Sequence, residues 1–116
     1  SFDEVERKLL GYDHGEVGGH LGEMWNLPEA LIAPIRYHHR PNDCDPTNPA
    51  VDCVHLADFL TMSMGYGLGG DGLRYNFSPE VLERLNIASS DLDQISSEFM
   101  DQYIAYEKAI GEMNAA

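Results

Sequence analysis

Five histidines and a few carboxylates are the side chains of this sequence that could do chemistry. Imidazoles and carboxylates are common ligands of divalent transition metals, and a bound metal ion can activate water for hydrolysis. His38 and His39 are adjacent, so on a helix they diverge by ~100° and can share one metal cluster only if the helix ends there or two metals bind. His14 opens another expected helix and could face the same interior. No Ser-His-Asp or Cys-His arrangement indicates nucleophilic catalysis.

His55 and Asp58 are three residues apart in the most apolar stretch of the chain, so a helix would place them on one face. A carboxylate buried there is costly unless it has a partner, and the imidazole is the nearest one. We prefer a buried hydrogen-bonded pair that fixes helix packing, with metal ligation as the alternative. For His38 and His39 the alternatives are an interaction with a helix C-terminal dipole and a metal or ligand role. For His14 we prefer a helix-start residue without a ligand, with a metal role as the alternative.

Length and charge bound the classes of protein that fit. The chain has 116 residues, with 7 basic and 20 acidic side chains and a net charge of −13. This size predicts a single domain over residues 1–116, and scattered bases among many acids argue against nucleic acid as a partner. No apolar stretch approaches the ~20 residues of a membrane span and no signal peptide is evident, so we expect a cytoplasmic protein. Cys44 and Cys53 are expected to be free thiols.

The elements that must position these side chains are helices. Apolar residues recur at helical spacing, glycine and proline punctuate the runs, and no segment alternates as a strand would. The fold class is therefore all-α, a compact bundle of five to six helices. Helices are expected over Phe2–Leu10, Asp13–Trp25, Pro28–His39, Ala50–Met64, Ser78–Leu85 and Leu92–Met113, with a polar loop at Arg40–Pro49 and a glycine-rich connection at Gly65–Asn76.

Three of these helices carry further expectations. The second contains several glycines, which weaken an isolated helix and so predict a close approach of another backbone. The fourth is apolar on nearly all sides and should be a buried central helix. The last is amphipathic, and its acids lie on the faces away from the apolar stripe.

Four blocks, in this order and spacing, resemble the HDOD family. They are Gly11–Gly19, Trp25–Pro28, Ile35–Pro41 and Val54–Asp58, and the resemblance is close over Leu9–Phe59. HDOD domains are HD-related output domains of bacterial signalling proteins and relatives of the HD and HD-GYP metal-dependent phosphohydrolases. The resemblance implies an HD-domain-like helical fold.

In the catalytic relatives, residues at the positions of His14, His38, His39 and Asp58 help to hold a di- or trinuclear metal centre. The resemblance therefore implies these four as candidate metal ligands, with His55 as a candidate for supporting a ligand from behind. The relatives also need an earlier histidine and a His-Asp dyad, which would lie upstream of Ser1. The chain is thus expected to be the C-terminal portion of a larger HDOD domain.

Two functions follow from these expectations. The first is a non-catalytic regulatory or interaction module with protein partners or other domains, no catalytic residue and no cofactor. The alternative is a metal-dependent phosphohydrolase of cyclic dinucleotides or nucleotides, with Fe, Mn or Zn and with its remaining ligands upstream. If upstream helices are missing, faces around His38, His39 and Val54–Leu60 would be exposed, and a homodimer is expected.

Overall fold

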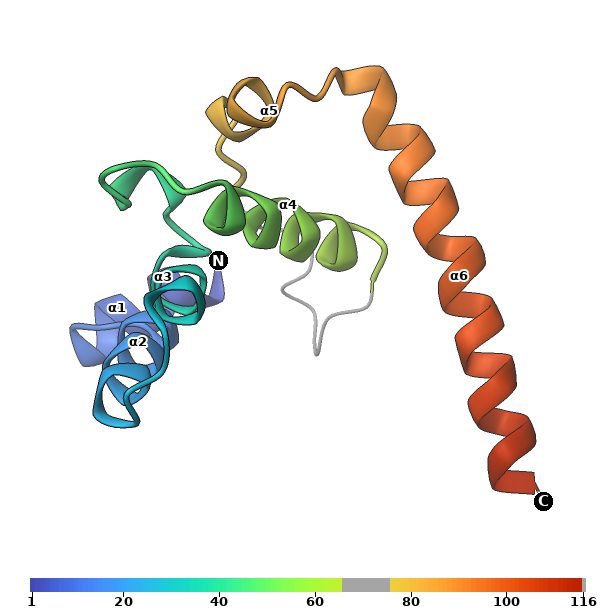
Figure 1. The fold of residues 1–116 in the computed structure, drawn as a ribbon, viewed down its shortest axis with the longest axis horizontal. Helices are drawn as coiled ribbons and strands as arrows, with labels where there is room; N and C mark the ends of the chain where they lie inside the picture. The colour runs from blue at the N-terminus through green and yellow to red at the C-terminus, as the bar shows by residue number, and fades with distance from the viewer. Residues whose placement is uncertain (66–75, 116) are drawn as a thin grey trace. The chain divides into compact units, whose positions relative to one another are not determined.

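The computed structural model describes residues 1–65 and 76–115, and every regular element in them is helical, which confirms the all-α fold class (Figure 1). Two compact units are present, Ser1–Leu85 and Asn86–Ala116. This division into units does not test whether residues 1–116 form one domain, and that expectation stays a prediction. The α-helices of the described ranges are α1 (Phe2–Leu10), α2 (His14–Met24), α3 (Glu29–Tyr37), α4 (Pro49–Ser63), α5 (Glu80–Leu85) and α6 (Ser89–Ala115), and a short 3₁₀ helix, η1 (Pro41–Asp43), follows α3.

The ends of the first helices follow the local signals. Gly11 closes α1 with a left-handed φ of 86°, which glycine adopts without strain. Asp13 caps α2 by accepting a hydrogen bond from the backbone N–H of Glu16, as the capping-box pattern predicts. Pro28 differs from the expectation by one position, because its ψ of 144° is extended and the helix begins at Glu29.

Glycines allow α2 and α3 to approach closely, as predicted. A Cβ built on Gly15 would lie 3.0 Å from the carbonyl oxygen of Arg36, and one on Gly19 would lie 2.9 Å from the Cβ of Arg36. Any larger residue at these positions would push the two helices apart. The glycines destabilise α2 as an isolated helix, but they let α3 pack closely against it. This contact fixes the position of α3, which leads into the histidine pair.

Helix α4 is buried on one face rather than on nearly all sides, so that expectation was wrong. Val51, Asp52, His55 and Leu56 are buried, whereas Val54 is 41% exposed. Among the described elements, α3, η1 and α5 pack on α4. When apolar residues lie on nearly all sides of a helix, its sequence does not indicate which face will be covered.

A buried ion pair links α4 to α5. Both Nε and Nη2 of Arg84 donate to the carboxylate of Asp52, at 2.8 and 2.6 Å, and the Asp52 side chain is 3% exposed. The second carboxylate of α4, Asp58, is half-buried, with a 33% exposed side chain. The buried acid of this helix is thus Asp52 and not the predicted Asp58.

The second unit consists mainly of α6, which confirms the amphipathic helix predicted from Leu92 to Met113 and extends it at both ends. None of its described residues is buried. The glycine-rich connection predicted at Gly65–Asn76 falls largely on residues 66–75, outside the described residues. No described helix combines the length and apolarity that crossing a bilayer requires.

Candidate functional site

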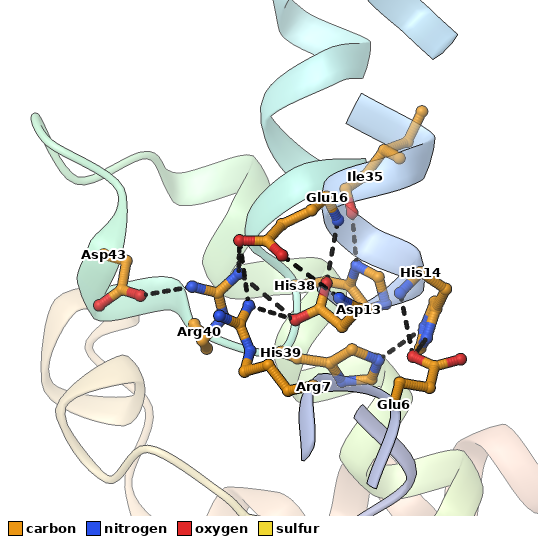
Figure 2. Close-up of polar contacts among 10 residues, drawn as sticks. All are labelled: Glu6, Arg7, Asp13, His14, Glu16, Ile35, His38, His39, Arg40 and Asp43. Carbon is orange, nitrogen blue, oxygen red and sulfur yellow. Dashed lines mark hydrogen bonds and ion pairs between the residues drawn. The ribbon is translucent and has the colours of Figure 1, made fainter. Parts of the chain in front are cut away.

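The structure brings three of the predicted site residues together where α1, α2 and the end of α3 meet (Figure 2). One ring nitrogen from each of His14, His38 and His39 lies within 4.8 Å of the others. His14 comes from the start of α2, and the other two follow the last turn of α3. The helix ends at Tyr37, which satisfies the condition that lets adjacent histidines converge.

Oxygen acceptors orient two of these rings. The Nδ1 of His14 donates to Glu6 at 2.6 Å, and the Nδ1 of His38 donates to the carbonyl oxygen of Ile35 at 2.8 Å. A proton held at Nδ1 leaves the Nε2 lone pair of a neutral ring available. The same Glu6 carboxylate accepts a bond from the backbone N–H of His14 at 2.9 Å, so α1 fixes this ring at two points.

His39 completes the cluster through a bond between imidazoles. Its Nε2 lies 2.8 Å from the Nε2 of His14. Because His14 uses its Nδ1 proton on Glu6, His39 is the donor in this bond when both rings are neutral. Burial and then the neighbouring charge of His38 lower the pKa of His39 to about 4. The ring is therefore neutral at physiological pH.

Asp58 lies at the edge of the cluster. Its Oδ2 is 3.7 Å from the Nδ1 of His39, which is longer than a hydrogen bond. His55, its predicted partner, uses its ring elsewhere: Nδ1 donates to the carbonyl oxygen of His38 at 2.6 Å, and Nε2 accepts from the backbone N–H of Ser78 at 3.1 Å. The His55 ring thus supports the turn that carries His38 and His39, through its hydrogen bond to the backbone of His38.

The ring of His55 is fully buried, at 0% exposure, and stacks on Phe77 with a centroid distance of 5.3 Å. Burial lowers its pKa, and the acceptor at His38 opposes this only in part. The neutral ring with its proton on Nδ1 satisfies both of the backbone groups that it contacts.

A network of carboxylates and arginines lies beside the histidines (Figure 2). Asp13, 1% exposed, accepts a 2.6 Å bond from Nη2 of Arg7, and Nη2 of Arg40 lies 3.4 Å away. Burial alone would raise its pKa, but the bonds from Arg7 and from the backbone N–H of Glu16, with the charge of Arg40, hold the pKa of Asp13 below its ordinary value. This network fixes the residue immediately before His14.

The donor set fits a divalent transition metal. Three imidazole nitrogens would leave an open position at an ion, and an oxygen acceptor on the opposite nitrogen, as His14 and His38 have, is the usual support of a metal-binding histidine. Two nitrogens on one tetrahedral ion would be about 3.3 Å apart, from metal–nitrogen distances of about 2.05 Å. The 2.8 Å between His14 and His39 would need to open by only about half an ångström.

An apolar groove borders this cluster. It has a volume of ≈ 730 Å³ and lies between α3 and α4, with His38 and Asp58 in its wall. Leu31, Ile35 and Val54 supply part of its apolar lining.

Sequence reasoning missed the supporting residues of the site. Glu6 and Arg7 lie on α1, and their contacts with His14 and Asp13 span eight and six residues across a turn. No periodic or motif signal marks such contacts. The capping box at Asp13 was visible, but not the two arginines that converge on it.

Comparisons with known proteins bear on the first part of the chain. Residues 1–41 match the model of the HDOD domain, and this segment includes His14, His38 and His39 but not Asp58. A protein of Treponema pallidum (strain Nichols), described only as an uncharacterized protein, is 39% identical over 46 residues. The match covers 39% of this chain and 9% of that protein. No solved structure matches. Over residues 1–41 the chain is therefore similar to an HDOD domain.

Proposed function

We propose that this chain is a non-catalytic regulatory or interaction module of a bacterial HDOD signalling protein. The observation that carries the proposal is that the protein itself supplies partners to the clustered histidines. His14 is bonded to Glu6, His38 to the carbonyl of Ile35, and His39 to His14. Such a cluster can hold α1, α2 and α3 together without performing chemistry.

The proposal includes protein partners or neighbouring domains, and a cytoplasmic location. The net charge of −13 disfavours nucleic acid and anionic lipid surfaces. The apolar groove between α3 and α4 offers an interaction surface next to the cluster.

A metal-dependent phosphohydrolase acting on cyclic dinucleotides or nucleotides is the second candidate. The convergence of three imidazole nitrogens within 4.8 Å favours it. His14, His38 and His39 would hold a divalent Fe, Mn or Zn ion, with Asp58 as an additional ligand. Such an ion would act as a Lewis acid and lower the pKa of a bound water. The remaining ligands of a di- or trinuclear centre would have to come from outside these residues.

Turnover by the protein expressed from its complete reading frame, so that any ligands from outside these residues are present, tests the choice. The protein is prepared without chelators, its metal content is measured by mass spectrometry, and cyclic dinucleotides and nucleotides are offered with Fe, Mn or Zn. We expect no hydrolysis above background. His14→Ala serves as the cluster variant, and His20→Ala is its matched control, because the His20 side chain is 73% exposed on the same helix. Hydrolysis that His14→Ala abolishes and His20→Ala retains would overturn the proposal in favour of the enzyme.

A further inference from the structure

Helix α6 carries a heptad pattern that the signalling role does not explain. Apolar or aromatic residues recur every seven positions, and a second series, offset by four, contains two more. This is the a/d spacing of a coiled coil, with one polar residue at a core position. In heptad notation the d positions are Leu92, Phe99, Tyr106 and Met113, and the a positions are Ser96, Tyr103 and Ile110.

The C-terminal half of this seam is open to solvent. Tyr106 is 71% exposed, Ile110 50% and Met113 78%. Single exposed apolar residues are common, but a continuous stripe along one helix usually marks an interface. The seam extends over most of the 27 residues of α6, a length of about 40 Å.

The heptad positions of the charged residues of α6 indicate which kind of helix packs against the seam. Four of its six acids occupy the outward c and f positions: Asp91, Glu98, Asp101 and Glu112. Only Asp93 and Glu107 lie at e, and no charged residue lies at g. A basic helical partner would be recognised through acids at both e and g, which flank a coiled-coil seam. The uncharged g positions argue against such a partner.

A second copy of α6, aligned in parallel, meets no like charge across the seam. In a parallel pair each g residue faces the e residue five positions later on the other helix. The pairs are then Ile95 with Met100, Gln102 with Glu107, and Ala109 with Asn114. The first pair is apolar and the second can form a hydrogen bond. An antiparallel pair that sets Tyr103 against Phe99 instead brings Asp93 towards Glu107.

We propose that α6 is a dimerisation element that pairs with α6 of a second copy as a parallel two-stranded coiled coil. Each copy brings six acids and one base to the pair, so the dimer carries a repulsion that salt screens. Dimerisation should therefore strengthen as salt increases. A basic partner would show the opposite dependence.

Two isoleucines of α6 provide a matched test. Ile110 lies in the seam and is 50% exposed, whereas Ile104 lies outside it at a b position and is 57% exposed. The 116-residue chain and its variants Ile110→Glu and Ile104→Glu are compared by analytical ultracentrifugation over a range of concentrations and salt. We expect a dimer whose dissociation constant rises at least about tenfold in Ile110→Glu and changes less than about twofold in Ile104→Glu. Circular dichroism of both variants checks that the helices remain folded.

Crosslinking tests the parallel alignment. Ser96→Cys in a Cys53→Ser background places one thiol at a core a position, where the two copies of a parallel dimer face each other. We expect rapid disulfide-linked dimers on mild oxidation. A chain that stays monomeric, equal loss of dimer in both isoleucine variants, or a dimer of Ser96→Cys that forms no disulfide between its copies would overturn the proposal. A monomer whose α6 packs in its own α3–α4 groove is one way in which the first of these results could arise.

Discussion

Replacing Arg84 by methionine should destabilise the first unit by about 3 kcal/mol, because it leaves the Asp52 carboxylate buried without its cation. The carboxylate is 3% exposed and takes two short bonds from the guanidinium, at 2.6 and 2.8 Å. Removing one partner of a buried ion pair costs roughly 3–5 kcal/mol. We take the lower end, since the Arg84 side chain is 24% exposed and water can reach the vacated position.

The size of this effect is large for a domain of this length. Domains are stable by only about 5–15 kcal/mol, and each kcal/mol shifts the melting temperature of a small domain by about 4–8 °C. Arg84→Met should therefore lower the melting temperature by about 12–24 °C. Urea unfolding followed by circular dichroism gives the free energy of unfolding directly.

A double variant separates the buried charge from the lost packing. Asp52→Leu combined with Arg84→Met removes both charges, and apolar replacement of a buried pair is often close to neutral. The double variant should thus recover most of the loss. Lys8→Met, which removes an exposed cation from α1, is the control and should change stability by less than about 0.5 kcal/mol. A cost below about 1 kcal/mol for Arg84→Met, or a double variant no more stable than the single one, would refute the reasoning.

Three further predictions concern the packing and the histidines. Gly19→Ala should destabilise the α2–α3 contact, because the alanine Cβ would lie 2.9 Å from the Cβ of Arg36. Gly111→Ala has no neighbour within 4 Å and should stabilise α6 by up to about 1 kcal/mol, and thermal melting distinguishes the two effects. The free energy of unfolding should fall as the pH drops from neutral through 6.5, because the pKa of His39 is lowered to about 4 and that of His55 also lies below 6.5. The unfolded chain therefore takes up protons that the folded chain does not. Urea unfolding across this pH range measures the slope, and a flat profile would contradict the prediction. Asp13→Ala should cost about 1–2 kcal/mol, since it removes a helix cap and the 2.6 Å bond from Arg7 while Glu16 still pairs with both arginines, and an unchanged urea midpoint would argue against that network.

The helices were predictable because their signals are local. Gly11, the capping box at Asp13 and the proline at position 28 each act on the nearest turn, and the structure places helix ends within one or two residues of them. The glycines of α2 likewise foretold a close neighbour, although not which helix it would be.

The choice of buried face could not be made in the same way. Asp52 and Asp58 both lie on an apolar helix, and periodicity offers no reason to prefer either. Asp52 is the buried acid because it pairs with Arg84, and this residue is 32 positions away from Asp52. The same reason hid Glu6, whose bond to His14 depends on how α1 folds back at Gly11. Long-range pairing is set by the tertiary fold, which one sequence does not disclose.

The carboxylate of Asp13 joins three separate parts of the chain, because it caps α2 and also meets Arg7 from α1 and Arg40 from the turn after α3. The arginines also pair with Glu16, at 3.2 Å from Arg7 and 3.4 Å from Arg40, whereas Asp13 would remain a buried charge without a cation if both arginines were replaced. Natural variation at these three positions should therefore be correlated, with both arginines changing only in relatives where Asp13 also changes. All three lie within residues 1–41, the segment that matches the HDOD model, so a set of family sequences can reveal this covariation without any experiment on the protein.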